Sequence, residues 1–97
     1  MHYFVYILYS AKLDRYYIGR STDPEKRLEF HNNPIEARKF TARGIPWKMM
    51  FSYQCESFEE SVKLERYLKK LKSRQALQML IENPSKIHEI IEEIRST

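Results

Sequence analysis

The side chains of this sequence best suited to phosphate chemistry are an arginine and a histidine at helical spacing. Arg27 and His31 are four residues apart in a segment expected to form a helix. Both side chains therefore emerge from one helix face, where they can meet a single phosphate group. An ordinary solvated pair on a helix surface is the simpler interpretation, and the spacing alone does not exclude it.

Glu65 fits a purely structural interpretation least well. In a helix it falls inside the apolar arc, between Leu68 on one side and Phe58 and Val62 on the other. An unpaired carboxylate in such a position is costly, so a partner is expected. Lys69, at the favourable four-residue spacing, is one candidate partner, and a bound metal ion is the other.

Two tyrosines and a glycine occupy segments expected to be neighbouring strands. Tyr6 and Tyr17 are two of seven tyrosines, most of which are expected to place an apolar ring in the core and a hydroxyl near water. Gly19 ends the second strand, where the missing side chain lets another backbone or a substrate approach closely. A glycine needed only for a turn gives the same pattern.

The elements that position these residues begin with a β-hairpin. Residues 3–9 and 15–19 are dense in aromatic and β-branched residues and are separated by a polar break, which predicts two paired strands. The first strand is apolar on both alternating faces, so it is expected to be central, with helices covering each side. A third strand is expected over residues 47–53.

A helix and a basic segment are expected to follow the hairpin. Asp23 can accept hydrogen bonds from free backbone amides, and Pro24 fits the first helical position, which predicts a helix reaching about Phe30 or Asn32. Residues 32–46 are polar, contain turn-forming glycine and proline, and have little to bury. This segment is predicted to be a mobile loop that contacts the substrate. Its basic residues are Arg38, Lys39 and Arg43.

Three further helices are expected in the C-terminal half. Residues 56–72 have the spacing of an amphipathic helix. Ser73 can cap a second helix, and Asn83 with Pro84 ends it and starts a third. Apolar residues line one face of each expected helix. They are Leu64, Tyr67, Leu68 and Leu71 in the first helix, Ala76, Leu77, Leu80 and Ile81 in the second, and Ile87, Ile90, Ile91 and Ile94 in the third.

Length and composition favour one globular domain over residues 1–97. A chain of 97 residues buries only about two-thirds of its unfolded surface and has no room for two cores. With 42% apolar and 31% charged residues, neither disorder nor a membrane span is favoured. The net charge of +4 suits a polyanionic partner, although solubility alone explains an excess of this size.

The cysteine content and the apolar start bear on the compartment. Cys55 is the single cysteine, so an intramolecular disulfide is excluded and a reducing compartment is expected. Residues 3–9 have no basic leader and run directly into charged residues. They are therefore expected to be a strand rather than a signal sequence, and the protein to be cytoplasmic.

The ordered set of these residues resembles the signature of the GIY-YIG nucleases. Phe4-Val5-Tyr6 stands at the first tripeptide of that family, with Phe4 in place of its glycine, and Tyr17-Ile18-Gly19 matches the second. Residues 23–32 match the helix that follows, and Glu65 takes the place of the family's metal-binding glutamate. Residues 39–47 resemble the small single-domain bacterial branch, which is related to the N-terminal nuclease domain of the excinuclease C subunit.

The resemblance implies an α+β fold and a catalytic site. The GIY-YIG fold has a three-stranded antiparallel sheet flanked by helices, here with extra C-terminal helices. Glu65 would hold Mg²⁺ or Mn²⁺, Arg27 would clamp the phosphate, and His31 would assist by a hydrogen bond. Tyr6 would be the general base, with its pKa lowered from about 10 by the metal and arginine charges, and Tyr17 would orient water or phosphate.

The activity expected from this resemblance is metal-dependent hydrolysis of DNA phosphodiester bonds. Selectivity for DNA structure in repair or recombination is one form that this activity can take, and RNA is left open as a substrate. Gly19, Arg38, Lys39 and Arg43 are the expected substrate contacts. Specificity is expected to be low, or to come from nucleic-acid structure or a protein partner. Two other interpretations stay open: a nucleic-acid-binding module with low activity in a larger complex, and an interaction protein that docks through its C-terminal isoleucines.

Overall fold

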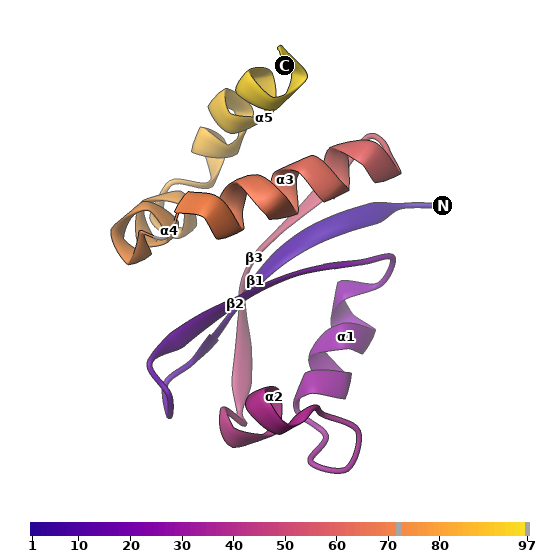
Figure 1. Ribbon diagram of the computed structural model, residues 1–97, viewed down its shortest axis with the longest axis vertical. Helices are drawn as coiled ribbons and strands as arrows, with labels where there is room; N and C mark the ends of the chain where they lie inside the picture. Colours follow the sequence, from indigo (N-terminus) through magenta and orange to yellow (C-terminus); the bar gives the residue numbers. More distant parts are fainter. Residues whose placement is uncertain (72, 97) are drawn as a thin grey trace.

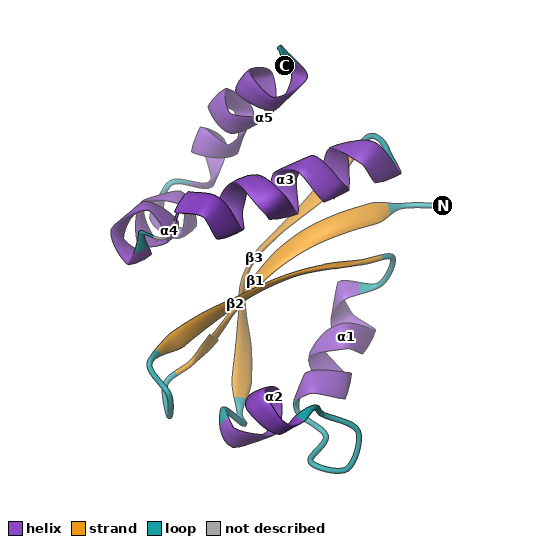
Figure 2. Cartoon of the chain, in the orientation of Figure 1, coloured by secondary structure: helices purple, strands orange, loops and turns teal. Residues whose placement is uncertain are grey.

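The protein is built around a three-stranded antiparallel sheet with helices on both faces (Figures 1 and 2). The computed structural model describes residues 1–71 and 73–96. The strands are β1 (Tyr3–Ser10), β2 (Arg15–Ser21) and β3 (Trp47–Cys55). The helices are α1 (Pro24–His31), α2 (Lys39–Arg43), α3 (Phe58–Leu71), α4 (Arg74–Glu82) and α5 (Ile87–Arg95), with a 3-10 turn at Pro84–Lys86. The predicted α+β fold class is confirmed.

Alternate residues of β1 contribute to two separate hydrophobic clusters. The strand order is β2-β1-β3, so β1 is central as predicted. Val5 and Ile7 point to the face covered by α3, α4 and α5. Tyr6 and Leu8 point to the opposite face, which α1 covers. Figure 1 shows α1 and α3 on opposite sides of the sheet, which is why a strand with apolar residues on both faces is stable here.

The first helix begins and ends where the sequence predicts. The Asp23 carboxylate accepts a hydrogen bond from the Lys26 amide at 3.2 Å, and Pro24 occupies the first turn. Asn32 caps the other end. Its side chain accepts a hydrogen bond from the Trp47 amide at 2.6 Å and donates one to the Trp47 carbonyl at 3.0 Å. This bridge fixes the C-terminal end of α1 against the start of β3.

The second half of the predicted mobile loop is instead attached to the sheet. Residues Lys39–Arg43 form α2, and Thr41 within it is buried. The Trp47 indole N–H donates to the Thr41 carbonyl at 2.7 Å, and the Ser10 hydroxyl donates to the Gly44 carbonyl at 2.6 Å. The prediction that this segment buries little is wrong here, because the buried indole N–H of Trp47 needs an acceptor and α2 supplies it.

The C-terminal helices follow the predicted pattern. The predicted helix over residues 56–72 corresponds to α3, and Lys72 lies outside the described residues. The Ser73 hydroxyl caps α4 by accepting a hydrogen bond from the Ala76 amide at 3.1 Å. The isoleucines of α5 pack into the protein's own core, which leaves the docking interpretation without an exposed stripe. Within the described residues, no helix has the length and apolarity needed to cross a membrane.

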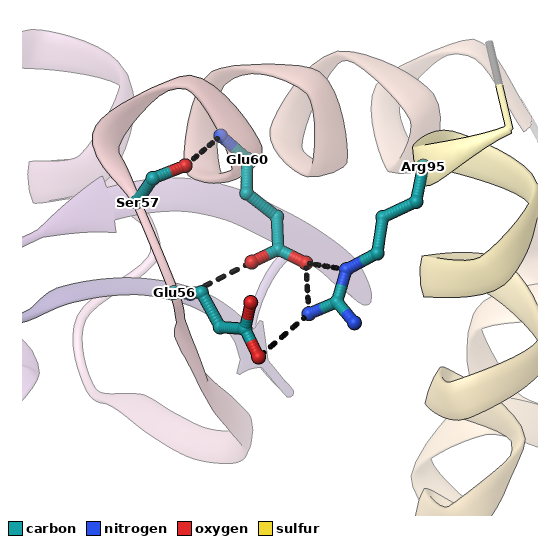
Figure 3. A network of polar contacts seen from close by, with 4 residues as sticks. All are labelled: Glu56, Ser57, Glu60 and Arg95. Atoms are coloured by element: carbon teal, nitrogen blue, oxygen red, sulfur yellow. Dashed lines mark hydrogen bonds and ion pairs between the residues drawn. The ribbon is translucent and has the colours of Figure 1, made fainter.

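A network of charged groups fastens α5 to the beginning of α3 (Figure 3). Glu60 is 7% exposed, and its carboxylate accepts hydrogen bonds from the Glu56 amide at 2.7 Å and from Arg95 Nε at 3.1 Å. The Arg95 guanidinium also lies 3.2 Å from the Glu56 carboxylate. The Glu60 amide donates to the Ser57 hydroxyl at 3.1 Å, which resembles a capping box. The sequence signal for this buried glutamate is the serine three residues before it.

Candidate active site

Gly19 makes room for the phenol ring of Tyr6. The two residues pair across β1 and the edge strand β2, so they face the same side of the sheet. A Cβ atom on Gly19 would lie 2.5 Å from the Tyr6 hydroxyl and 2.6 Å from the ring carbon that bears it. The ring therefore lies across Gly19, and its hydroxyl reaches toward the edge of the sheet.

This position of Gly19 differs from the predicted one. The glycine lies inside β2, which continues to Ser21, and it is buried under the Tyr6 ring. The space that a substrate was expected to use beside Gly19 is taken by the phenol. The missing side chain thus positions Tyr6 and does not leave the glycine backbone open to a substrate.

His31 is the buried partner of Tyr6. It is 2% exposed, and its Nε2 lies 3.2 Å from the Tyr6 hydroxyl. Burial, with a smaller contribution from the charge of Arg27, lowers the pKa of His31 to about 4, so the imidazole is neutral at pH 7. The other ring nitrogen, Nδ1, is buried and has no hydrogen-bond partner within the described residues. His31 therefore reaches the site through Tyr6, and does not meet a phosphate beside Arg27 as the helical spacing predicts.

Arg27 occupies the more accessible part of α1. It is half-buried, and its guanidinium carbon lies 4.4 Å from the centre of the Phe30 ring, a cation–π contact. Its positive charge lowers the pKa of both the Tyr6 phenol and the His31 imidazole. A side-chain hydrogen bond between Arg27 and the Tyr6 phenol lowers the pKa of that phenol further, so Arg27 contacts Tyr6 directly.

Burial dominates the titration of Tyr6. Desolvation raises the pKa of the phenol above its ordinary value of 10, and this outweighs the lowering by Arg27. Neighbouring Tyr17 and the negative charge of Glu65 raise the pKa further. The sequence-based expectation was a pKa lowered by positive charge. That expectation counted the charge of a bound metal ion together with Arg27, so it stays a prediction. Among the protein groups alone, removing the hydroxyl from water disfavours the phenolate more than one arginine favours it.

Tyr17 completes an aromatic wall around the Tyr6 hydroxyl. It precedes Gly19 by two positions on β2, so it faces the same side. The Tyr17 ring centre lies 4.7 Å from that of His31 and 6.1 Å from that of Trp47. The ring is half-buried, which leaves part of it accessible beside the site.

Glu65 approaches the same edge of the sheet from the opposite face. Its side chain is 19% exposed, and its charge acts on the Tyr6 phenol. One carboxylate oxygen accepts a hydrogen bond from Arg20 Nε at 2.9 Å, and the other lies 3.4 Å from Lys69 Nζ. The predicted Lys69 partner is present. The closer partner, Arg20, was missed, although strand alternation after Gly19 places it on the α3 face.

Comparison with known proteins identifies this arrangement. Residues 2–78 match the family described as the GIY-YIG catalytic domain. The chain belongs to the GIY-YIG family. The matched range contains every residue described above for the site and ends within α4, so α5 and its network with Glu60 extend beyond it at the C-terminal end.

Three relatives show the range of proteins to which this GIY-YIG chain is similar. A UPF0213 protein from Streptococcus pneumoniae serotype 4 is 35% identical over 80 residues, which cover 82% of this chain and 79% of that protein. A solution NMR structure of a UPF0213 protein from Bacillus halodurans is 30% identical, covers 84% of each chain and gives a TM-score of 0.50. A structure-specific endonuclease subunit SLX1 homolog from Cryptosporidium parvum is 40% identical over 50 residues, which are 50% of this chain and 12% of that protein.

The GIY-YIG site offers a metal ion a single carboxylate. Residues 1–71 and 73–96 contain no group of three or more His, Cys, Asp or Glu side chains that is arranged to hold a metal. Glu65 nevertheless fits Mg²⁺, because this hard cation prefers oxygen ligands, keeps several waters and is commonly held by one or two carboxylates plus substrate phosphates. The donor set fits, although Arg20 and Lys69 contact the same carboxylate.

The basic residues predicted to contact substrate lie beside this centre. Arg38, Lys39 and Arg43 are exposed on or next to α2. The Phe40 ring centre is 6.4 Å from that of Trp47, which in turn contacts Tyr17. The α2 region that carries these three cations therefore contacts the aromatic residues of the site through Phe40 and Trp47.

Proposed function

We propose that this protein is a metal-dependent endonuclease that hydrolyses phosphodiester bonds of DNA. The observation that carries the proposal is the geometry at β2, where the Tyr6 ring lies over Gly19 and Glu65 is hydrogen-bonded to the next residue, Arg20. Arg27 and Glu65 both act on the pKa of the Tyr6 phenol. Hydrolysis of a phosphodiester needs a proton acceptor, a group that stabilises charge on the phosphoryl oxygens, and help for the leaving oxygen. Membership of the GIY-YIG catalytic domain family supports the same activity.

Tyr6 is proposed as the general base that accepts a proton from the attacking water. Because burial raises the pKa of its phenol, the phenolate needs support from its neighbours. His31 is neutral, and in the tautomer with its proton on Nε2 it donates a hydrogen bond to the Tyr6 oxygen. Arg27 adds a positive charge nearby. Both contacts favour the phenolate at the moment the proton is transferred.

Arg27 is proposed to bind the scissile phosphate. Its guanidinium is half-buried and held by the Phe30 ring, so it is oriented before a substrate arrives. A planar guanidinium can donate two parallel hydrogen bonds to phosphate oxygens and stabilise the charge that develops on them. Tyr17, whose ring borders the same site, is proposed to orient water or phosphate.

Glu65 is the residue that would hold Mg²⁺ or Mn²⁺. When bound, the cation would supply positive charge to a phosphoryl oxygen and lower the pKa of a coordinated water. The negative charge of the Glu65 carboxylate raises the pKa of the Tyr6 phenol, which supports a metal ligand within electrostatic reach of the proposed base.

DNA is the proposed substrate class, and RNA is kept as the alternative. The net charge of +4 and the exposed cations of the α2 region suit contacts with a phosphate backbone, which add affinity without reading sequence. The SLX1 homolog is named as a structure-specific endonuclease subunit. By analogy we propose selectivity for nucleic-acid structure, supplied in part by a protein partner, and a role in DNA repair or recombination in the cytoplasm.

The test is a cleavage assay with a panel of labelled substrates. Purified protein is incubated with flap, branched, single-stranded and duplex DNA, and with RNA of the same sequence, in Mg²⁺, in Mn²⁺ and in chelator. The proposal predicts metal-dependent cuts within at least one DNA substrate and none in chelator. Binding to all substrates without cleavage would overturn it in favour of a nucleic-acid-binding module.

A further inference from the structure

Arg20 is a charged residue of the site to which the proposed mechanism assigns no role. Its Nε donates to one oxygen of Glu65 at 2.9 Å, whereas Lys69 Nζ lies 3.4 Å from the other oxygen. The Arg20 side chain is also the less exposed of the two, at 35% against 57% for Lys69. A guanidinium at this distance forms a charge-assisted hydrogen bond, which is stronger than a neutral one. Arg20 is therefore the principal partner of the proposed metal ligand.

The position of Arg20 does not depend on Glu65 alone. Arg20 follows Gly19 in β2, so the strand itself directs the side chain to the α3 face. Its guanidinium carbon lies 5.3 Å from the centre of the Phe58 ring, which is 52% exposed. An aromatic ring attracts a guanidinium without using its hydrogen-bond donors. Phe58 can therefore keep Arg20 at this edge when Glu65 takes another partner.

We propose that Arg20 and the divalent cation compete for Glu65, so that metal binding releases the Arg20 guanidinium to contact a nucleic-acid phosphate. The inference rests on the proposed function, because it takes Glu65 as the metal ligand. Two cations at bonding distance from the same carboxylate oxygen repel each other strongly. The released guanidinium keeps its planar set of donors, which matches a phosphate group. Metal binding and substrate binding are thereby coupled through one side chain.

Lys69 provides a matched control. It also carries one positive charge and also contacts Glu65, but at a longer distance and with a more exposed head group. It lies four residues from Glu65 on α3, an arrangement that contributes little in water. Removing either cation changes the charge near the metal ligand by the same amount, so a difference between the two variants reports the Arg20 hydrogen bond itself.

The experiment is a Mg²⁺ titration followed by NMR on wild type, Arg20→Gln and Lys69→Gln. The side-chain carboxyl carbon of Glu65 reports metal binding, and the Arg20 Nε–H signal of the wild type reports release. We expect Arg20→Gln to lower the Mg²⁺ midpoint about tenfold and Lys69→Gln to lower it less than about threefold. Backbone amide spectra verify folding. Arg20→Lys, which keeps the charge but loses the planar fork, replaces the glutamine variant if that variant does not fold, and its midpoint should also fall.

A second measurement tests the phosphate contact. Binding of a labelled DNA duplex is measured in Tyr6→Phe proteins, which lack the proposed base, with and without Arg20→Gln. The arginine substitution should weaken binding several-fold in saturating Mg²⁺ and leave it unchanged in chelator. Equal weakening under both conditions would overturn release by the metal.

The remaining outcomes separate this inference from the proposed function. Equal midpoints for Arg20→Gln and Lys69→Gln, or an unchanged Arg20 Nε–H signal while Glu65 responds, would overturn the competition and leave Glu65 as the metal ligand. If the NMR signal of the Glu65 carboxyl carbon does not change with Mg²⁺ in any of the three proteins, Glu65 is not the metal ligand. That result would overturn this inference as well.

Discussion

Two glutamates on the same helix, Glu60 and Glu65, have opposite surroundings. Glu60 is almost fully buried at the start of α3, where it accepts hydrogen bonds from a backbone amide and from Arg95 of α5 (Figure 3). Glu65, in the middle of α3, is more exposed, and its partners are the flexible side chains of Arg20 and Lys69. Both carboxylates are negatively charged and contact cationic side chains. They differ because Glu60 also accepts a hydrogen bond from a backbone amide, whereas the partners of Glu65 are side chains.

This difference indicates which carboxylate is available for chemistry. Glu60 is less able to change partners, because its carboxylate is almost fully buried and one of its partners is a backbone amide at the start of α3. Glu65 can change partners by side-chain rotation alone, since a part-exposed ion pair contributes little to stability. A ligand site is therefore expected at Glu65 and a structural clamp at Glu60.

Substituting Arg27 should separate catalysis from binding. We expect Arg27→Ala to reduce the single-turnover cleavage rate by about 10²–10³-fold, because it removes a group that stabilises charge developing in the transition state. DNA affinity should fall by less than about threefold, since many other cations hold the backbone. Arg95→Ala is the matched arginine, and it should lower stability while the folded fraction cleaves at the wild-type rate. An equal loss in affinity with normal single-turnover cleavage would make Arg27 an ordinary phosphate contact.

His31 is buried like Glu60 but contacts the site residue Tyr6, and its lowered pKa should make the stability of the protein depend on pH. Its pKa is about 4 in the folded protein, against about 6.5 in an unfolded chain. As the pH falls below about 6.5, the unfolded chain binds a proton that folded His31 does not, so stability present at neutral pH is lost progressively down to about pH 4, by about 3 kcal/mol. Chemical denaturation at several pH values measures this loss. The difference in stability between wild type and His31→Gln should shrink over the same pH range, and a constant difference would contradict the buried neutral imidazole.

Removing Glu60 from its network with Arg95 should lower the stability of the fold and leave the cleavage rate of the folded protein unchanged. Glu60→Ala is expected to lower the free energy of unfolding by about 2 kcal/mol, less than for a fully buried pair because Arg95 is half exposed. Urea denaturation gives the value, with exposed Glu59→Ala as the control. Wild-type stability in Glu60→Ala would show that the clamp in Figure 3 does not stabilise the fold.

The smallest effect is expected at the α2 region. Replacing Arg38, Lys39 and Arg43 together by glutamine should weaken binding of unrelated DNA sequences alike, by about tenfold at low salt, and reduce the salt dependence of the affinity. The cleavage rate at saturating protein should stay within about twofold, because these exposed cations lie outside the catalytic face. An unchanged salt slope in a binding titration would remove this region from the substrate surface.

The parts of the fold that depend on short-range patterns could be predicted from the sequence. The hairpin follows from apolar and β-branched runs, and the start of α1 follows from Asp23 and Pro24. Glu65 stands out from helical periodicity alone, and the predicted pairing with Lys69 is present.

The features that depend on long-range contacts could not be predicted in this way. The Tyr6 ring lies over Gly19, Arg20 pairs with a glutamate 45 positions away, and α2 is attached through a hydrogen bond from Ser10 to a carbonyl 34 positions away. Burial of His31 depends on how α1 packs on the sheet. Helical spacing therefore placed His31 near Arg27, but it could not indicate that the imidazole contacts the Tyr6 hydroxyl. Each of these contacts joins residues from two different secondary-structure elements, and local sequence patterns do not report such contacts.

The division of roles between Glu65 and Glu60 is tested most directly by measuring cleavage and stability on the same preparations of Glu65→Gln and Glu60→Gln. Single-turnover cleavage at one Mg²⁺ concentration is compared with urea denaturation. We expect Glu65→Gln to lose at least about 100-fold in cleavage rate and less than about 1 kcal/mol in stability, whereas Glu60→Gln should lose stability and keep its cleavage rate once folded. A Glu65→Gln protein that cuts DNA as fast as wild type at that Mg²⁺ concentration would contradict this division of roles.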